Sequence, residues 1–485
     1  MKRERWLLLV IILLAFGLRC LRIAERSIQY DDAFTILLAQ QSVDEILSGT
    51  AADTMPPLYY LILHFWMALG QSIWLYRLPT IFLGVGSVWM MYALTREVAG
   101  VKAGLWAALL TAISPLQYYH SQDIRMYALL GFTQLGYAWC FARLVSGKRS
   151  WKEWVGLIAF GTAAMYTHNL AIFGLVAANF YLLVKRDWHL LGKLILAQLG
   201  IALLDLPWLV MIPGQVQKIQ TAFWIARPGL VEVVQALMTA ITDLPLPGIW
   251  LGVGLGLTIW IFFIGAWSWF KDRPAGTGLL ACFCFLPPAL LFILSYFMRP
   301  IFLPRGFIGA LLIFLGLNAV IIAGGRLKGA AQGMVVAWLA AAVIGLSVQV
   351  NFNEFPRPPF EQAMRELSAT LRPGELVVHD NKLSAFPCEV YAPEVEQAFV
   401  GDEPGSPSDN LALASQQALD MYAEPDLETA VAGHDRIAYI VFQEAVDEYI
   451  EAGMDDHPGL TWIRENYTQV SEQDFNGLLV FRFSR

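Results

Sequence analysis

Apolar runs of bilayer length recur through the first 350 residues of this chain and limit what it can fold into. A bilayer core of about 30 Å requires about 20 predominantly apolar residues for each helical span. Eleven predicted spans cover residues 6–23, 77–96, 103–119, 126–142, 153–168, 170–184, 190–211, 249–270, 276–297, 303–323 and 331–350. This pattern predicts an α-helical polytopic membrane protein with about 11 spans.

The distribution of charge divides the chain near residue 350. Residues 351–485 hold 8 of the 33 Lys and Arg but 25 of the 40 Asp and Glu, a net charge of −17. The first 350 residues carry +10, and about 11% of them are charged, against roughly 25% in an average soluble domain. The overall charge of −7 therefore describes two domains of different character.

Composition also places the domain boundaries. Residues 1–350 form the predicted transmembrane domain, with an outer loop at 24–76 that carries amphipathic helices. The proline-rich stretch 351–359 is a predicted linker. Beyond it, residues 360–485 predict a small α/β domain outside the membrane. Its expected helices are 360–371 and 426–433, and its expected strands are 375–380, 436–442 and 477–483.

Basic residues predict the orientation, because cytoplasmic loops are enriched in Lys and Arg. If the run 57–70 lies at the outer face without crossing, 16 of the 25 basic residues of the first 350 fall on the side of the N-terminus. If it crosses, this pattern breaks. We therefore expect a multi-pass protein of the cytoplasmic (inner) membrane, with a cytoplasmic N-terminus and an extracytoplasmic C-terminal domain.

Two classes of partner or cofactor are disfavoured by composition. The basic residues are scattered and the tail is acidic, so nucleic acid is not an expected partner. The five cysteines show neither paired spacing nor a zinc pattern. The expected environment is the lipid bilayer.

Two acids directly follow the first predicted span. Asp31 and Asp32 lie within Tyr-Asp-Asp-Ala at 30–33. A carboxylate at the edge of an apolar cavity suits a general base. Either acid can instead cap a helix predicted at 33–47, so both interpretations stay open.

The remaining candidates also lie on the predicted outer side. Asp123 and Arg125 lie in His-Ser-Gln-Asp-Ile-Arg-Met-Tyr at 120–127, where they form either a site or only a surface ion pair. Several outer arginines together suit an anionic headgroup such as a lipid phosphate, although each one can instead snorkel. These basic residues are Arg77, Arg125, Lys218, Arg227, Arg299 and Arg305. His64, His168 and the intramembrane acid Asp205 are weaker candidates.

The order of these motifs resembles a known superfamily. Besides the two motifs above, the chain has Pro-Pro-Leu-Tyr-Tyr at 56–60, Tyr-Arg-Leu-Pro at 76–79, Tyr-Thr-His-Asn at 166–169 and Leu-Pro-Arg at 303–305. Over residues 1–350 the set is similar to the GT-C membrane glycosyltransferases. Within them it resembles the bacterial, family 39-like branch related to protein O-mannosyltransferases and the lipid A aminoarabinose transferase.

The resemblance implies an activity and assigns residues to it. Such enzymes pass a sugar from a polyprenyl-phosphate donor to an acceptor hydroxyl, with inversion, outside the cytoplasmic membrane. Asp31 matches the expected base, whereas Asp32 and Asp123 stand where Glu is more frequent. Met55 replaces the His or Lys found in better-known members, so no contact is carried over to it. The substrate-binding residues expected from the matched motifs and outer arginines are Arg77, Arg125, Tyr59, Tyr60, His168, Arg227 and Arg305.

Several alternatives remain at this stage. Asp31, Asp32 and Asp123 could share a divalent metal, but no ligand spacing requires one. A secondary transporter of an anionic or amphipathic solute is the main rival. Transporters usually show repeated halves with polar groups at midplane, and neither is evident here. A non-catalytic scaffold leaves the acid pair and the outer arginines without a role. The acceptor stays open among protein, lipid and glycan.

Overall fold

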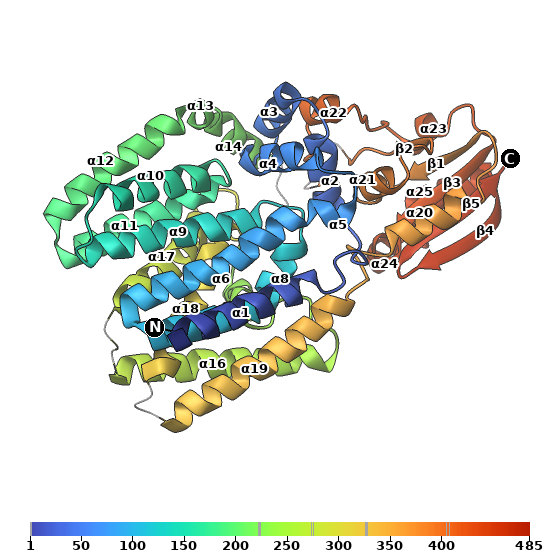
Figure 1. The fold of residues 1–485 in the computed structure, drawn as a ribbon. Helices are drawn as coiled ribbons and strands as arrows, with labels where there is room; N and C mark the ends of the chain where they lie inside the picture. Colours follow the sequence, from blue (N-terminus) through green and yellow to red (C-terminus); the bar gives the residue numbers. More distant parts are fainter. Residues whose placement is uncertain are drawn as a thin grey trace. The chain divides into compact units, whose positions relative to one another are not determined.

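The computed structural model describes the chain except residues 1, 222–224, 273, 275, 325–327, 404 and 407 and the side chains of 218–221 and 328. By its internal contacts the chain divides into two compact units (Figure 1). We call Met1–Ile23 with Thr54–Asn351 the helical unit, and Ala24–Asp53 with Phe352–Arg485 the α/β unit. The sequence-based division kept 24–53 with the membrane domain, whereas the structure groups it with the C-terminal residues.

All the regular secondary structure described in the helical unit is helical. They are α1 (Lys2–Cys20), α4 (Leu58–Met67), α5 (Ile73–Tyr76), α6 (Leu78–Ala99), α7 (Val101–Ala112), α8 (Pro115–Gln122), α9 (Tyr127–Val145), α10 (Trp151–Met165), η1 (Asn169–Ala171), α11 (Ile172–Lys185), α12 (Trp188–Leu204), α13 (Leu206–Leu209), α14 (Ile212–Thr221), α15 (Leu230–Ile241), α16 (Ile249–Asp272), α17 (Thr277–Leu294), η2 (Pro304–Phe307), α18 (Ile308–Gly324) and α19 (Lys328–Asn351).

Helices lie over all eleven predicted spans, but they are not equally able to cross a membrane. Among the described residues, five helical segments are long and apolar enough by themselves, and a sixth arises if the bent pair α12 and α13–α14 counts as one span. The five are Ile73–Ala99, Ile249–Asp272, Thr277–Leu294, Pro304–Gly324 and Gly329–Asn351. The chain is a multi-pass, mostly helical membrane protein, as predicted.

The predicted span 103–119 is interrupted in the structure. Helix α7 ends at Ala112, and α8 begins at Pro115 after Ser114. The residue before a proline is disfavoured in the helical conformation, and proline is well tolerated at the start of a helix. The Ser114 hydroxyl also accepts a hydrogen bond from the Gln117 amide at 3.4 Å. The break places the residues after 115 on a short helix of their own.

Burial separates the centre of the helical unit from its surface. The most apolar 18-residue window of Pro304–Gly324, which includes α18, is 89% buried, whereas the corresponding window of α16 is only 22% buried. A helix that is apolar all round and still exposed requires an apolar solvent. Helix α18 is therefore the core of this unit, and α16 presents side chains to lipid.

Helix α4 covers most of the run 57–70. Its 10 residues extend about 15 Å at 1.5 Å per residue, roughly half of the bilayer core. The Leu58 amide donates to the carbonyl of Tyr166 at 3.1 Å, which joins the start of α4 to the connection after α10. This helix is too short to cross a membrane alone.

The α/β unit has one mixed sheet with the strand order β2-β1-β3-β5-β4. The β1 strand pairs in parallel with β2 and β3, and β5 pairs antiparallel with β3 and β4. Its elements are α2 (Tyr30–Ala39), α3 (Val43–Ala52), α20 (Phe360–Ser368), β1 (Glu375–His379), α21 (Lys382–Tyr391), β2 (Gln397–Phe399), α22 (Leu413–Leu419), α23 (Leu427–Ala430), β3 (Arg436–Phe442), α24 (Gln443–Glu451), α25 (Pro458–Asn466), β4 (Thr468–Phe475) and β5 (Leu478–Ser484).

Aromatic packing explains why residues 24–53 belong to this unit. The ring of Phe386 in α21 lies 5.1 Å from that of Tyr30 and 6.4 Å from that of Phe34, both in α2. The Ile28 amide also donates to the hydroxyl of Tyr391 at 3.2 Å. Contacts of this kind depend on tertiary packing more than on local sequence. The prediction from composition could not detect them and therefore assigned this segment to the membrane domain.

Candidate functional site

Arg125 of the helical unit is held against helix α4. Its side chain follows α8 and is only 5% exposed. One terminal nitrogen, Nη1, donates to the hydroxyl oxygen of Tyr60 at 3.2 Å. Tyr60 is itself fully buried in α4. Arg125 is therefore a buried cation rather than a headgroup anchor on the surface.

Arg305 and His168 meet the same region from two other segments. The Arg305 guanidinium, in η2, lies over the ring of Tyr127 at 5.5 Å from its centroid. The His168 ring lies 6.3 Å from the Tyr127 ring. A cation over an aromatic face is attracted by the ring quadrupole. We call Tyr60, Arg125, Tyr127, His168 and Arg305 the Tyr127 cluster.

The hydrogen bonding of His168 fixes which nitrogen can donate. The Leu170 amide donates to Nδ1 of His168 at 3.1 Å, where the imidazole caps the start of η1. A nitrogen that accepts a hydrogen bond carries no proton, so in the neutral ring the proton is on Nε2. His168 thus offers one N–H donor beside two guanidinium groups.

Asp123 lies next to His120, whose ring lies near the Tyr127 ring. The Asp123 carboxylate is 2% exposed, and Oδ2 lies 3.6 Å from Nδ1 of His120. The His120 ring lies in turn 5.2 Å from the Tyr127 ring. Because Asp123 and Arg125 are both buried, the interpretation of this pair as a solvent-exposed surface ion pair is wrong.

Two buried arginines hold the segment that leads to Asp123. Arg77 is fully buried and donates to the backbone oxygens of Gln122 at 3.0 Å and Ile23 at 2.6 Å. Arg19, also fully buried, donates from Nε to the Ser121 hydroxyl at 3.0 Å and from Nη1 to the Ala112 carbonyl at 3.1 Å. Arg77 was expected to bind substrate. Its hydrogen bonds instead hold the backbone at Gln122 and Ile23 in place. Arg19 was not among the predicted site residues, although an arginine within an apolar span was a usable signal.

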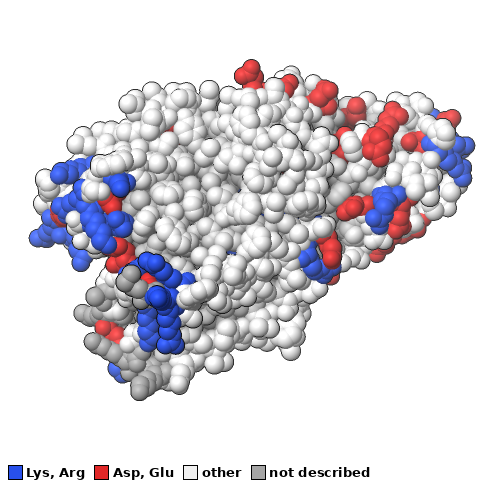
Figure 2. All heavy atoms as spheres, in the orientation of Figure 1, with Lys and Arg blue, Asp and Glu red and all other residues white. Residues whose placement is uncertain are grey.

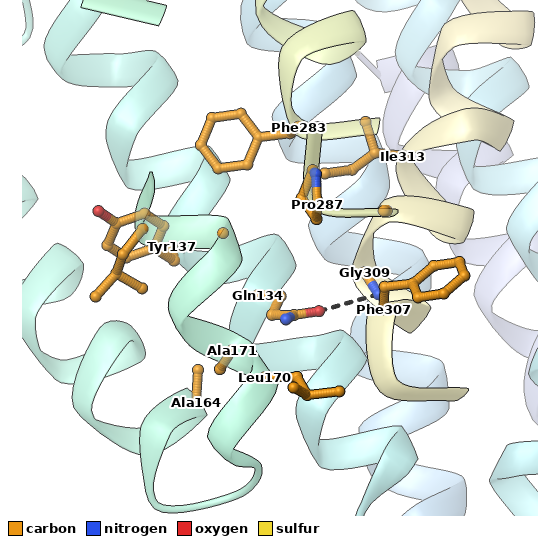
Figure 3. Close-up of a pocket in the computed structure, with 13 residues that line it drawn as sticks. Gln134, Tyr137, Ala164, Leu170, Ala171, Phe283, Pro287, Phe307, Gly309 and Ile313 are labelled. Atoms are coloured by element: carbon orange, nitrogen blue, oxygen red, sulfur yellow. Dashed lines mark hydrogen bonds between the residues drawn. The ribbon is translucent and has the colours of Figure 1, made fainter. Parts of the chain in front are cut away.

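A small cavity marks the seam between the segments that carry His168 and Arg305 (Figure 3). It has a volume of about 20 Å³ and is lined by Leu170, Phe307 and Gly309 among others. The side-chain oxygen of Gln134 accepts the Gly309 amide proton at 3.0 Å across this seam. One water needs at least about 10–15 Å³, so this space has room for about one water and is too small to be a substrate pocket.

Asp31 and Asp32 lie in the α/β unit and differ in their surroundings. Asp32 is 1% exposed, and its Oδ2 accepts the Gln29 amide proton at 3.0 Å at the start of α2. The same oxygen lies 3.9 Å from Nη2 of Arg357. Asp31, on the same turn, is half-buried. The structure therefore uses Asp32 to cap the helix, which begins at Tyr30 and ends at Ala39 rather than covering 33–47.

The remaining predicted residues are placed as follows. Tyr59 is fully buried in α4 next to Tyr60. Arg227 is exposed in the connection before α15, and among the described side chains it forms no hydrogen bond or ion pair. The side chain of Lys218 lies outside the described residues. The described residues contain no group of three or more His, Cys, Asp or Glu that could hold a metal ion.

The fold can be compared with known proteins. The family model described as dolichyl-phosphate-mannose-protein mannosyltransferase matches residues 54–211. YycA of Bacillus subtilis (strain 168), named as a proposed mannosyltransferase, is 28% identical over 169 residues, which are 33% of this chain. The match spans only 24% of YycA.

Solved structures match over nearly the whole chain. ArnT from Cupriavidus metallidurans in the apo state gives a TM-score of 0.67 at 12% identity, covering 99% of this chain and 98% of ArnT. ArnT bound to undecaprenyl phosphate gives 0.65 at 13% identity, covering 98% and 97%. The archaeal oligosaccharyltransferase AglB from Archaeoglobus fulgidus, in complex with an inhibitory peptide and a dolichol-phosphate, gives 0.58 at 12% identity, covering 99% and 74%.

These matches define the fold of the chain. The chain has the GT-C fold of membrane glycosyltransferases. The particular likeness is to ArnT, which it matches from end to end, and the resemblance predicted from the sequence motifs is confirmed at the level of the fold.

Proposed function

We propose that this protein is an inverting glycosyltransferase that moves a sugar from a polyprenyl-phosphate donor to an acceptor hydroxyl on the outer face of the membrane. The observation that carries the proposal is the Tyr127 cluster, where the half-buried Arg305 lies over the Tyr127 ring and the buried Arg125, two residues before Tyr127 in the chain, donates to the hydroxyl of Tyr60. Two guanidinium groups in an apolar helical unit suit a lipid phosphate, because each can donate paired, charge-assisted hydrogen bonds to its oxygens. The match to ArnT bound to undecaprenyl phosphate supports this class of donor.

In the proposed reaction the bond between the anomeric carbon and the phosphate oxygen breaks, and the phosphate keeps the electron pair. Arg125 and Arg305 donate hydrogen bonds to the phosphate as its negative charge increases, and Nε2–H of His168 adds a third donor. The acceptor oxygen forms its bond to the anomeric carbon from the opposite face, which inverts the configuration. Its proton passes to a carboxylate.

Asp31 is the proposed general base. Asp32 caps α2 and lies beside Arg357, so its carboxylate is already engaged within the protein. Asp31, which is half-buried, is the more accessible of the two carboxylates. Asp123, beside His120, is proposed to orient groups of the Tyr127 cluster rather than to take the proton.

The proposed orientation places the N-terminus in the cytoplasm and the α/β unit outside the inner membrane. Figure 2 shows Lys and Arg gathered at the end of the helical unit near the N-terminus of the chain. At the end of α9, Arg143 pairs with Glu153, and Lys148 in the connection that follows pairs with Glu97. Cysteines introduced at residues 50, 72 and 400 should all react from outside with an impermeant reagent. Protection at 72 alone would overturn this topology.

The function is tested with purified protein in liposomes and a panel of polyprenyl-phosphate sugars. We expect one donor to lose its sugar to an added acceptor, with the opposite anomeric configuration in the product. Uptake of an anionic or amphipathic solute without sugar transfer would instead support the transporter interpretation and reject this proposal.

A further inference from the structure

A second, larger cavity lies between helices α16, α17 and α18. Its volume is about 260 Å³, and its walls are almost entirely aromatic and aliphatic. Trp269 and Phe270 come from α16, Phe285 from α17, and Phe314 and Leu317 from α18. An apolar cavity of about 150 Å³ already binds benzene in another protein, so this one has room for a longer hydrocarbon segment.

This cavity is remote from the Tyr127 cluster. Its α18 residues lie between Phe314 and Ile321, which are 9 and 16 residues beyond Arg305. At 1.5 Å per residue, the cavity lies roughly 14–24 Å along the helix axis from Arg305. Its α16 residues belong to the half of that helix that ends at Asp272. The cavity and the cluster therefore occupy opposite halves of the helical unit.

The cavity is bounded by lipid-exposed side chains on one side and by the core on the other. Phe270 and Phe285 are 66% and 44% exposed, and neighbouring Phe263 and Trp267 on α16 are also exposed. At the inner side, Phe314 and Asn318 of α18 are buried. An exposed apolar rim on a membrane protein faces hydrocarbon, so a ligand can enter this cavity from the bilayer.

Asn318 places one polar atom in this otherwise apolar lining. Its Nδ2 donates to the Phe314 carbonyl at 2.8 Å, so Oδ1 is the atom left to accept. Among the described residues Oδ1 has no hydrogen-bond donor, although Asn318 is only 2% exposed. A Cβ added to Gly265, which lines the cavity, would lie 3.3 Å from this oxygen. A buried amide oxygen without a donor is unfavourable in apolar surroundings.

We propose that this cavity binds a membrane lipid through a hydrocarbon segment that carries a hydroxyl group. The hydroxyl donates to Oδ1 of Asn318, and the hydrocarbon fills the space beside Trp269, Phe285 and Phe314. A plain acyl chain would fill the volume but leave the oxygen without a donor. A single water would satisfy the oxygen but leave the apolar walls empty.

The test uses the full-length protein in liposomes and a pair of photoreactive probes. One is a long-chain primary alcohol with a diazirine in its chain, and the other is its methyl ether, which has the same chain but no donor. After irradiation, mass spectrometry of the peptides measures labelling of α16, α17 and α18. We expect the alcohol to label these helices at least fivefold more than the ether.

Three variants make the result specific. Asn318→Leu keeps the volume and removes the acceptor, so the preference for the alcohol should disappear. Ala281→Leu adds a side chain to the cavity wall and should lower labelling by both probes severalfold. The matched control is Gly256→Leu on α16, where an added Cβ meets nothing within 4 Å, and it should label like the wild type.

Each other outcome overturns the proposal. Equal labelling by both probes in the wild type would mean that any acyl chain occupies the cavity. Absence of labelling on these helices would mean that no lipid enters it. Should Ala281→Leu fail to elute as a folded species, competition of the wild-type labelling by unlabelled dodecanol, but not by its methyl ether, gives the same decision.

Discussion

Two arginines, one from each unit of this protein, show two different uses of charge. In the helical unit Arg19 is fully buried and donates to a hydroxyl and to carbonyls at the end of α7. In the α/β unit Arg464 pairs with Asp456, and both side chains keep substantial exposure to solvent. An exposed pair of this kind contributes little to stability, whereas a buried guanidinium must find its hydrogen bonds within the protein. A buried arginine such as Arg19 is therefore placed for positioning or for chemistry.

The largest expected effect concerns the two neighbouring acids of α2. Asp31→Asn keeps the size of the side chain and removes the base, so turnover should fall about 10²–10⁴-fold while donor binding stays intact. Asp32→Asn is the matched control, and it should mainly lower stability, since Asp32 caps the helix. Turnover is measured by sugar transfer in liposomes. If Asp31→Asn stays within a few-fold of wild type, the assignment of the base is wrong.

The next effect tests whether the two arginines of the Tyr127 cluster bind phosphate or only anchor their helices. Arg125→Ala and Arg305→Ala should each lower turnover about 10²–10³-fold, because the leaving phosphate loses a donor. The Lys variants should retain intermediate activity, since an ammonium lacks the paired donors of a guanidinium. Wild-type turnover in both Lys variants, with only reduced expression of the Ala variants, would favour anchoring.

A smaller effect is expected for Arg19. Arg19→Met removes its side-chain hydrogen bonds, and leaving buried acceptors without donors should destabilise the helical unit by about 1–3 kcal/mol. Arg96→Met is the control, because Arg96 is half-exposed and pairs with Glu4 at 3.3 Å. Thermal unfolding in detergent compares the two. Equal changes in both variants would contradict the distinction between buried and exposed arginines.

The pH dependence of the α/β unit gives an effect similar in size to that expected for Arg19. Burial lowers the pKa of His379 to about 4, although a hydrogen bond to Gln397 opposes this shift. The unfolded chain binds the proton below about pH 6.5 and the folded chain does not, so stability is present above that pH and is lost on acidification. At pH 5 the expected loss is about 2 kcal/mol.

Hydrogen exchange of β1 and β3 at pH 7 and pH 5 measures this loss. His379→Gln keeps a polar group at the position without a proton to gain, so its β1 and β3 amides should show a smaller change between the two pH values. The same acid-induced loss of protection in the wild type and in His379→Gln would assign it to other groups.

The sequence predicted the parts of the structure that composition and local pattern control. Helices lie over all eleven apolar runs, and β3, a nearly continuous apolar strand, occupies 436–442 as predicted. By contrast, β4 escaped prediction because all but one of its residues are exposed, and it depends on pairing with β5. The helix break at Ser114-Pro115 could have been predicted from the proline, but the apolar run around it favoured one continuous span.

The candidate site was predictable only in part, for a related reason. The predicted outer position of Arg125 and Arg305 departs from the bias of basic residues toward the cytoplasm, and this signal is local. The meeting of Arg305 and His168 at the Tyr127 ring depends on how η1, η2 and the start of α9 pack, which no short motif records. Arg77 illustrates the same limit, since its sequence context could not distinguish binding of a phosphate from binding of two backbone carbonyls.

The central claim is that the Tyr127 cluster holds the donor phosphate, and equilibrium binding of a polyprenyl phosphate without its sugar tests it most directly. We expect Arg125→Ala and Arg305→Ala each to weaken binding at least tenfold, because each guanidinium supplies charge-assisted hydrogen bonds. Arg227→Ala, which replaces an exposed arginine outside the cluster, should bind like the wild type. Unchanged affinity in both cluster variants, with the proteins folded, would contradict the account.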